Sequence, residues 1–323
     1  MADRADDIID RRRLRRKLTF WRVAALLLVV AGVALATSWA MRGSMGGAAA
    51  SHIARVSIEG TITENEELLS RLERIGESAS VQGVILSIDS PGGTTAGGEA
   101  IFEAVRKLAE KKPVVAQVGT LAASAGYMIA SAADHIVARQ SSIVGSIGVL
   151  VQFPDVTGLM DRIGVRLEGV KSSPLKAEPS PFTPTTDEER AMLRALVMDS
   201  YDWFVGLVED RRPLSRTEVL AVADGSIFTG RQALERKLVD SLGGQETAIE
   251  WLATKGVDPE LGVIEWKQPS SGFLADYTLA GLIGKVLGLD AAQGDLARKL
   301  GADRLFLDGL LSLWQPDVSA LAD

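Results

Sequence analysis

The sequence predicts an α/β domain with a mostly parallel sheet and flanking helices, preceded by one N-terminal transmembrane helix. Two observations support this. Short β-branched runs alternate with stretches whose apolar residues recur at helical spacing, which is typical of parallel α/β folds. Near the N-terminus, residues 23–41 form an uncharged, mostly apolar run. The chain has 323 residues, of which 46% are hydrophobic, so it can bury a sizeable core.

Residues 23–41 are long enough to cross a membrane, because a helix rises about 1.5 Å per residue and a bilayer core is about 30 Å thick. Arginine and lysine cluster in residues 1–22, so this segment should stay in the cytoplasm and everything after Arg42 should lie outside. A cleaved signal peptide with its site after Ala36 is the alternative. The length of the run favours an uncleaved anchor, followed by a flexible linker over 42–51.

Strands and helices alternate through the domain that follows. The expected strands are 52–58, 83–89 and 113–119, with two more within 134–151. The expected helices are 64–79, a helix that carries Ile101, Phe102, Val105 and Leu108 on one face, and one that begins near Ser124. The Pro/Ser-rich loop 171–185 then leads to a capping box, Thr186 to Glu189, which opens a long helix to about Arg211. A second capping box, Ser215 to Glu218, opens a shorter helix.

The domain should cover residues 52–260, with 261–323 as a C-terminal extension of uncertain role. In that extension the stretches "GLIGKVLGL" and "LFLDGLLSLW" are compatible with amphipathic helices that dock on a neighbour, on a membrane surface or on the domain itself.

Composition excludes several classes of function. The net charge is −7 and the body of the chain has no basic stripe, which argues against nucleic acid as a partner. There are no cysteines, so disulfides and thiol catalysis are excluded. With two histidines and no HExxH pattern, a zinc protease has almost no support.

Ser124 is a candidate nucleophile, because it lies among small residues that allow a second backbone to approach. It should stand at the start of a helix, just beyond a strand, where free N–H groups favour developing negative charge. Two glycine-rich turns, Gly92-Gly93 and the one at Gly119, are expected at the same crevice. Gly93 could then supply a second N–H for an oxyanion hole.

The base that would activate Ser124 is less obvious. His135 should start a strand beyond the helix, and His52 lies beside the linker, so neither is well placed. A lysine can serve if burial lowers its pKa from about 10.4 towards neutrality, which would make activity rise with pH. Lys171 and Lys176 both lie in a loop that is poor in charge, and spacing alone does not choose between them.

Five motifs in register, spread over about residues 53–255, are similar to those of a known family. They are "SIDSPGG", "GTLAASAGYMIASAADHIVA", "GSIGV", "VKSSPLKAEPSPFTPTTDEE" and "DGSIFTGRQALERKLVDSLGG". In these motifs the sequence resembles signal peptide peptidase A (SppA), in its short single-domain bacterial form. This is a family of membrane-anchored serine proteases in the Clp-protease/crotonase superfamily, so the resemblance implies a Clp-protease/crotonase-like fold.

The resemblance implies a role for five residues. Ser124 takes the place of the nucleophile, Lys176 that of the general base, and Ser146 that of the serine that orients the lysine. The backbone N–H groups of Gly93 and Ala125 would form the oxyanion hole. The resemblance also implies neither a metal nor an organic cofactor. It implies signal peptide remnants and misfolded exported proteins as substrates, and a homo-oligomeric ring in which adjacent protomers contribute serine and lysine.

The sequence departs from the family pattern at three places. Ala125 follows the nucleophile where glycine is frequent, which keeps the N–H. The base lies in "SPLKA" rather than G-x-x-K-D, and Ser226 stands where an arginine is usual.

Two other functions compete with a protease. One is an acyl-CoA enzyme, since crotonases share the fold, but no basic cluster beside "SPGG" is present to bind the phosphates of CoA. The other is a catalytically inactive membrane scaffold, which labelling of Ser124 by a fluorophosphonate would exclude.

Overall fold

The computed structural model describes residues 50–267, a few isolated positions between 21 and 32, and residues 311–313. The chain divides into two compact units, residues 1–51 and 52–323. Most of the predicted anchor, 23–41, lies outside the described residues. Within the part that is described, no helix has both the length and the apolar character needed to cross a membrane.

Strands and helices alternate through the second unit, as the sequence predicts. The strands are β1 (His52–Ile62), β2 (Val81–Thr94), β3 (Val114–Ala123), β4 (His135–Ala138), β5 (Ile143–Gly145), β6 (Ile227–Thr229), β7 (Ser241–Leu242), β8 (Val263–Glu265) and β9 (Leu311–Leu313). The helices are α2 (Glu66–Glu77), α3 (Thr95–Ala109), α4 (Ala125–Ala132), α5 (Thr157–Ile163), α6 (Asp187–Arg211), α7 (Arg216–Leu220), α8 (Gly230–Glu235) and α9 (Gln245–Thr254).

The strands form one mostly parallel sheet, which confirms the predicted α/β class. Its main path runs β6-β5-β3-β2-β1-β8, while β4 and β7 continue the sheet from the amino-terminal part of β3. Only two pairings between described strands are antiparallel, β5 with β6 and β2 with β9. Since β1, β2, β3 and β4 are parallel, their carboxyl ends meet at one edge of the sheet, where ligands of such folds bind.

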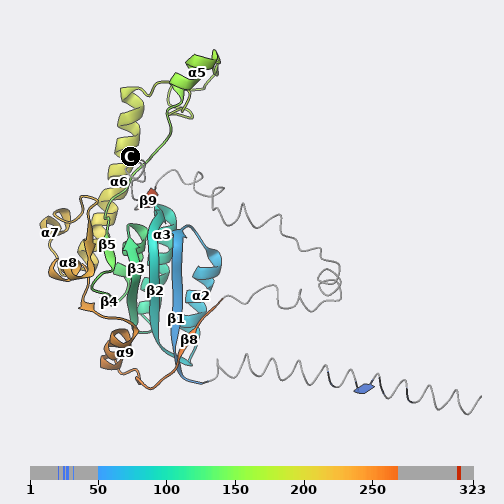
Figure 1. The fold of residues 1–323 in the computed structure, drawn as a ribbon, viewed down its shortest axis with the longest axis vertical. Helices are drawn as coiled ribbons and strands as arrows, with labels where there is room; N and C mark the ends of the chain where they lie inside the picture. Colours follow the sequence, from blue (N-terminus) through green and yellow to red (C-terminus); the bar gives the residue numbers. More distant parts are fainter. Residues whose placement is uncertain are drawn as a thin grey trace, which may run out of the picture. The chain divides into compact units, whose positions relative to one another are not determined.

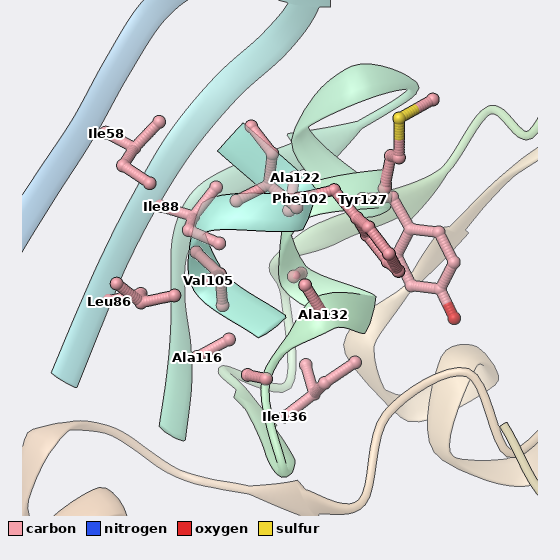
Figure 2. Close-up of a cluster of buried hydrophobic side chains, with 14 of the residues drawn as sticks. Ile58, Leu86, Ile88, Phe102, Val105, Ala116, Ala122, Tyr127, Ala132 and Ile136 are labelled. Atoms are coloured by element: carbon pink, nitrogen blue, oxygen red, sulfur yellow. The ribbon is translucent and has the colours of Figure 1, made fainter. Parts of the chain in front are cut away.

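The core lies between one face of the sheet and the helices that cover it. Alternate residues of the strands point to this face, where they meet α2, α3, α4 and the second half of α6. Figure 2 shows side chains of this core: Ile58, Leu86, Ile88, Phe102, Val105, Ala116, Ala122, Tyr127, Ala132 and Ile136. The buried Tyr127 hydroxyl donates to the Leu238 carbonyl at 2.9 Å. The other face is covered by α9 over Ile53, Ile85, Val115 and Val137.

One segment extends away from the sheet. It comprises α5, the loop that follows it and the first half of α6, which together we call the arm, residues 157–200 (Figure 1). α6 begins at the predicted capping box, in which Thr186 and Glu189 each accept a hydrogen bond from the other's backbone. Its 25 residues span roughly 37 Å. Phe204, Val205 and Val208 are buried in its second half, so only that half joins the core.

The structure corrects two expectations. Gly92 and Gly93 do not form a turn: they continue β2 and pair with Thr61 and Ile62 of β1, and Gly119 likewise lies inside β3. The stretch "LFLDGLLSLW" contains the strand β9 at residues 311–313, so a continuous helix there is wrong. The stretch "GLIGKVLGL" lies outside the described residues.

Candidate active site

Ser124 lies where β3 ends and α4 begins. Its backbone has φ 56° and ψ −120°, a conformation that costs a residue with a side chain about 1–3 kcal/mol and is most frequent at functional sites. The Ser124 amide donates to the Gly145 carbonyl at 2.8 Å, and its own carbonyl accepts from Met128 at 2.9 Å. Ser124 is therefore held by backbone bonds on both sides, and the first N–H groups of α4 follow it directly.

The small residues around Ser124 let α4 pack closely on its neighbours. A Cβ atom added to Gly126 would lie 2.9 Å from the carbonyl oxygen of Ser90 in β2. One added to Gly98 in α3 would lie 3.1 Å from the Ala125 side chain. Close packing of this kind fixes the start of α4 against the carboxyl end of β2.

Ser146 is brought next to Ser124 by the register of β3 and β5. Ala123 pairs with Gly145, so each serine follows one member of the same pair. Ser146 also has a positive φ, 52°, and its amide donates to the carbonyl of Ser226 at 2.7 Å. Two strained serines thus leave adjacent strands at the same point, and both are buried.

Gly93 lies at the same edge, at the end of β2. A Cβ atom there would come within 1.8 Å of the Ile62 carbonyl oxygen, so the close approach of β1 alone requires glycine. Ser90 supports this end of the strand: its hydroxyl donates to the Gly60 carbonyl at 2.6 Å and accepts from the Gly92 amide at 3.1 Å. Gly93 therefore has a structural reason to be glycine, independent of any catalytic role.

Both histidines lie at the opposite edge of the sheet from Ser124, because they start β1 and β4. His52 accepts a hydrogen bond from the Trp266 indole at 2.9 Å. His135 contacts the Ser241 hydroxyl at 2.9 Å and stacks on Trp251, and burial lowers the pKa of its imidazole. Neither ring is placed to act as a base for Ser124.

The two lysines of the 171–185 loop have different surroundings. Lys171 forms an ion pair with Glu178, whose side chain is only 5% exposed, so its ammonium already has a partner. Lys176 is exposed on a turn closed by its amide and the Ser173 carbonyl. Within residues 50–267 the structure shows no ion pair or hydrogen bond of the Lys176 side chain. The structure thus brings Ser124, Ala125, Ser146 and Gly93 to one edge of the sheet, and within one chain it leaves Lys176 on the exposed arm.

The sequence analysis did not identify the groups that hold Ser146 and the end of β2 in place. The Ser226 carbonyl holds the Ser146 amide, while the Ser226 amide donates to the Asp224 carboxylate at 2.9 Å. Hydrogen bonds from the Ser226 side chain and from its amide lower the pKa of the Asp224 carboxyl group. The Asp-Gly-Ser sequence is a turn signal that could have revealed this support. The Ser90 hydroxyl could not be found in this way, because its partner Gly60 is remote in sequence.

A metal centre finds no support in the described part of the chain, where no three His, Cys, Asp or Glu side chains are grouped as ligands.

Comparison with known proteins identifies the family. The model of peptidase family S49 matches residues 106–258, and that of Clp protease matches residues 50–144. The chain is 37% identical over 255 residues to a Synechocystis sp. protein named "Putative protease slr0021", covering 77% of this chain and 87% of the relative. It is 32% identical over 263 residues to "Putative signal peptide peptidase SppA" of Enterococcus faecium, covering 77% of this chain and 76% of the relative.

A plant protein is also similar. "Serine protease SPPA, chloroplastic" of Arabidopsis thaliana is 32% identical over 256 residues, which cover 76% of this chain and 36% of that longer protein. Taken with the α/β fold and the serine at the carboxyl edge of the sheet, these matches show that the chain belongs to peptidase family S49 and is a serine protease.

Proposed function

We propose that this chain is a membrane-anchored serine endopeptidase with a Ser–Lys dyad, in which Ser124 is the nucleophile and Lys176 the general base. The observation that carries the proposal is the junction of β3 and α4. There a buried serine with a strained backbone begins a helix at the edge where parallel sheets bind ligands.

The nucleophile and its oxyanion hole would come from one chain. Neutral Lys176 takes the proton of Ser124, and the serine oxygen attacks the carbonyl carbon of a peptide. The N–H groups of Gly93 and Ala125 stabilise the oxyanion, and each such donor contributes about 10²–10³ in rate. Protonated lysine then returns the proton to the leaving amine, and water hydrolyses the acyl-enzyme.

The base would come from an adjacent copy of the chain, with Ser146 orienting its amine. Two features of the arm support this. Lys176 is exposed, and the arm carries exposed apolar side chains that a monomer would leave in water. These are Leu159, Ile163, Val165, Leu167, Val170, Phe182, Leu196 and Met198. A head-to-tail contact that covers them must close into a ring to avoid filaments, and the Clp-protease match is compatible with such an assembly.

The substrates we propose are signal peptide remnants, with misfolded exported proteins as a second source. Support comes from the printed name of the Enterococcus faecium relative and from the apolar run 23–41, which as an anchor would keep the protease outside the cytoplasmic membrane. Apolar peptides left in the membrane would then lie within reach of the site.

A fluorophosphonate probe tests the nucleophile directly. We expect it to label the wild-type chain once, on Ser124, and to leave Ser124→Ala unlabelled. Ser131→Ala is a matched control, because Ser131 lies in the same helix with its hydroxyl bonded to the Met128 carbonyl. Labelling that persists in Ser124→Ala, or its absence from the wild type, would contradict the proposal.

A further inference from the structure

The outer edge of β1, on the side away from β2, is only partly covered. β8 pairs with this edge from Ile53 to Arg55 and no farther. The Ile53 amide donates across the edge at 3.1 Å and the Arg55 carbonyl accepts across it at 2.9 Å, so every second residue of β1 directs its N–H and C=O to this side. Ser57 and Glu59 are the next such residues. Their backbone groups therefore face outward without a strand partner among residues 50–267.

An open cleft of about 550 Å³ lies along this uncovered edge. Its volume is within the range of small-molecule binding sites, and its lining comes from β1, from α2 and from the end of β8. The residues that line it are Arg55, Ser57, Glu59, Arg71, Glu265 and Lys267. Every one of these side chains is polar or charged, so a ligand of this cleft has to be polar as well.

Arg55 is held in a fixed orientation in the cleft. Its Nε lies 3.4 Å from a carboxylate oxygen of Glu265, which also accepts a hydrogen bond from the Ser57 hydroxyl at 2.8 Å. The terminal nitrogens of Arg55 donate to the Ser87 hydroxyl at 2.9 Å and to the Gln245 side-chain oxygen at 3.2 Å. A guanidinium has more N–H groups than these contacts use, so Arg55 can still donate to a ligand.

Arg71 projects into the same cleft from α2 and has no such partner. Its Nε is buried and donates to nothing in the described part of the chain, where no carboxylate pairs with its guanidinium either. A buried donor without an acceptor is unfavourable, and a ligand oxygen would satisfy it. The pair of Arg55 and Glu265 cancels, which leaves Arg71 and Lys267 against the single carboxylate of Glu59. The cleft thus has one excess positive charge.

We infer that this cleft binds a phosphodiester group, either on a phospholipid head group or on a soluble ester. A phosphodiester carries one negative charge, which matches the excess charge of the cleft. The cationic donors come from three elements and so from different directions, which suits the tetrahedral oxygens of phosphate better than a planar carboxylate that one arginine fork satisfies. The outward N–H groups of Ser57 and Glu59 add backbone donors, as at other anion sites. The Glu59 carboxylate would accept from a hydroxyl or ammonium group of the same ligand.

Calorimetric titration of the full-length chain in a phosphate-free maltoside detergent tests the site. We expect glycerophosphoethanolamine, a water-soluble head group, to bind at one site per chain and about tenfold more weakly to Arg71→Gln. Lys267→Gln, at an exposed position, should weaken binding too. Arg74→Gln is the matched control, because it removes the same charge from an exposed position of the same helix, and it should bind as the wild type does.

Dimethyl phosphate and acetate then identify the ligand. If glycerophosphoethanolamine binds about tenfold more tightly than dimethyl phosphate, the site recognises a phospholipid head group. Equal or weaker binding of glycerophosphoethanolamine supports a soluble ester. The inference is overturned if neither phosphodiester binds, if acetate binds as tightly as dimethyl phosphate, or if Arg71→Gln binds as the wild type does. None of these titrations needs peptidase activity, so their result is independent of the proposed role of Ser124.

Discussion

The junction of β3 and α4 at Ser124 and the loop that carries Lys176 differ in how firmly the rest of the chain holds them. Ser124 is 1% exposed, with backbone bonds to β5 and within α4, and α4 packs closely on β2 and α3 beside it. Lys176 is exposed in a loop of the arm, where its side chain contacts no charged group of the described residues. One half of the candidate site is thus fixed within the chain, whereas the other is not.

This difference bears on how the protease is controlled. A preformed nucleophile without its base is inactive, so a single anchored copy would spare the secretory proteins around it. Under the proposed shared site, activity would require an assembly that brings the arm of one copy to Ser124 of the next.

The largest effect is expected from removing either half of the dyad. Ser124→Ala and Lys176→Ala should each lower kcat by about 10⁴-fold or more, because an unactivated or absent nucleophile leaves only binding and the oxyanion hole. Hydrolysis of a fluorogenic peptide measures this. Lys171→Ala is the control and should stay active, since Lys171 is paired with Glu178. If Lys171→Ala is inactive and Lys176→Ala is not, the base has been assigned to the wrong lysine.

Mixing the two inactive variants tests whether the site is shared. If adjacent copies contribute serine and lysine, equal amounts of Ser124→Ala and Lys176→Ala under subunit exchange should restore about a quarter of wild-type activity. One site in four then combines an intact serine with an intact lysine from its neighbour. Mass spectrometry of the mixed oligomers shows that exchange occurred. Mixed oligomers that remain silent would place the dyad within one chain.

The sequence predicted the parts of the fold that depend on local signals. The apolar runs at 83–89 and 113–119 became β2 and β3, and the capping box at Thr186 correctly marked the start of α6. Each signal lies within a few residues of the feature that it predicts, so neighbouring residues are enough to decide the structure.

Features that depend on long-range pairing could not be predicted in this way. Gly92-Gly93 has the composition of a turn, but pairing with β1 and β9 makes it strand. The closeness of Ser146 to Ser124 follows from the register between β3 and β5, which periodicity does not specify. The family resemblance suggested Ser146 and Lys176 from motif positions, and their catalytic roles remain predictions.

A medium effect on stability is expected at the carboxyl end of α6, beyond the arm. Arg212, just after α6, donates two hydrogen bonds to the Asp240 carboxylate, at 2.9 and 2.7 Å. Its guanidinium is almost fully buried, so Asp240→Asn should lower the free energy of unfolding by about 3 kcal/mol at pH 7. Urea unfolding measures this, and Asp202→Asn, in an exposed and longer ion pair with Arg216, should change little.

The same pair predicts a pH dependence. Burial alone would raise the pKa of Asp240, but hydrogen bonds from Arg212 and from the Ile136 amide, with His135 nearby, hold this pKa below its ordinary value. A lowered folded-state pKa gives stability that is present above about pH 4 and is lost as the pH falls through the folded value. The difference between the wild type and Asp240→Asn should therefore shrink at pH 3. A difference that is constant with pH would show that the charge of Asp240 does not matter.

The smallest effect compares one glycine in each region. A methyl group on Gly126 would lie 2.9 Å from the Ser90 carbonyl oxygen, in backbone that cannot easily move, whereas one on Gly158 in α5 would meet nothing within 4 Å. Gly126→Ala should therefore lower the free energy of unfolding by about 1–3 kcal/mol and slow the labelling of Ser124, because the start of α4 has to shift. Gly158→Ala should be neutral or stabilising by at most about 1 kcal/mol, since alanine favours helix. Urea unfolding and labelling rates measure both. If Gly126→Ala behaves like Gly158→Ala, the close contact of α4 with β2 is not what fixes the nucleophile, and the strained backbone of Ser124 must be held by its bond to Gly145 instead.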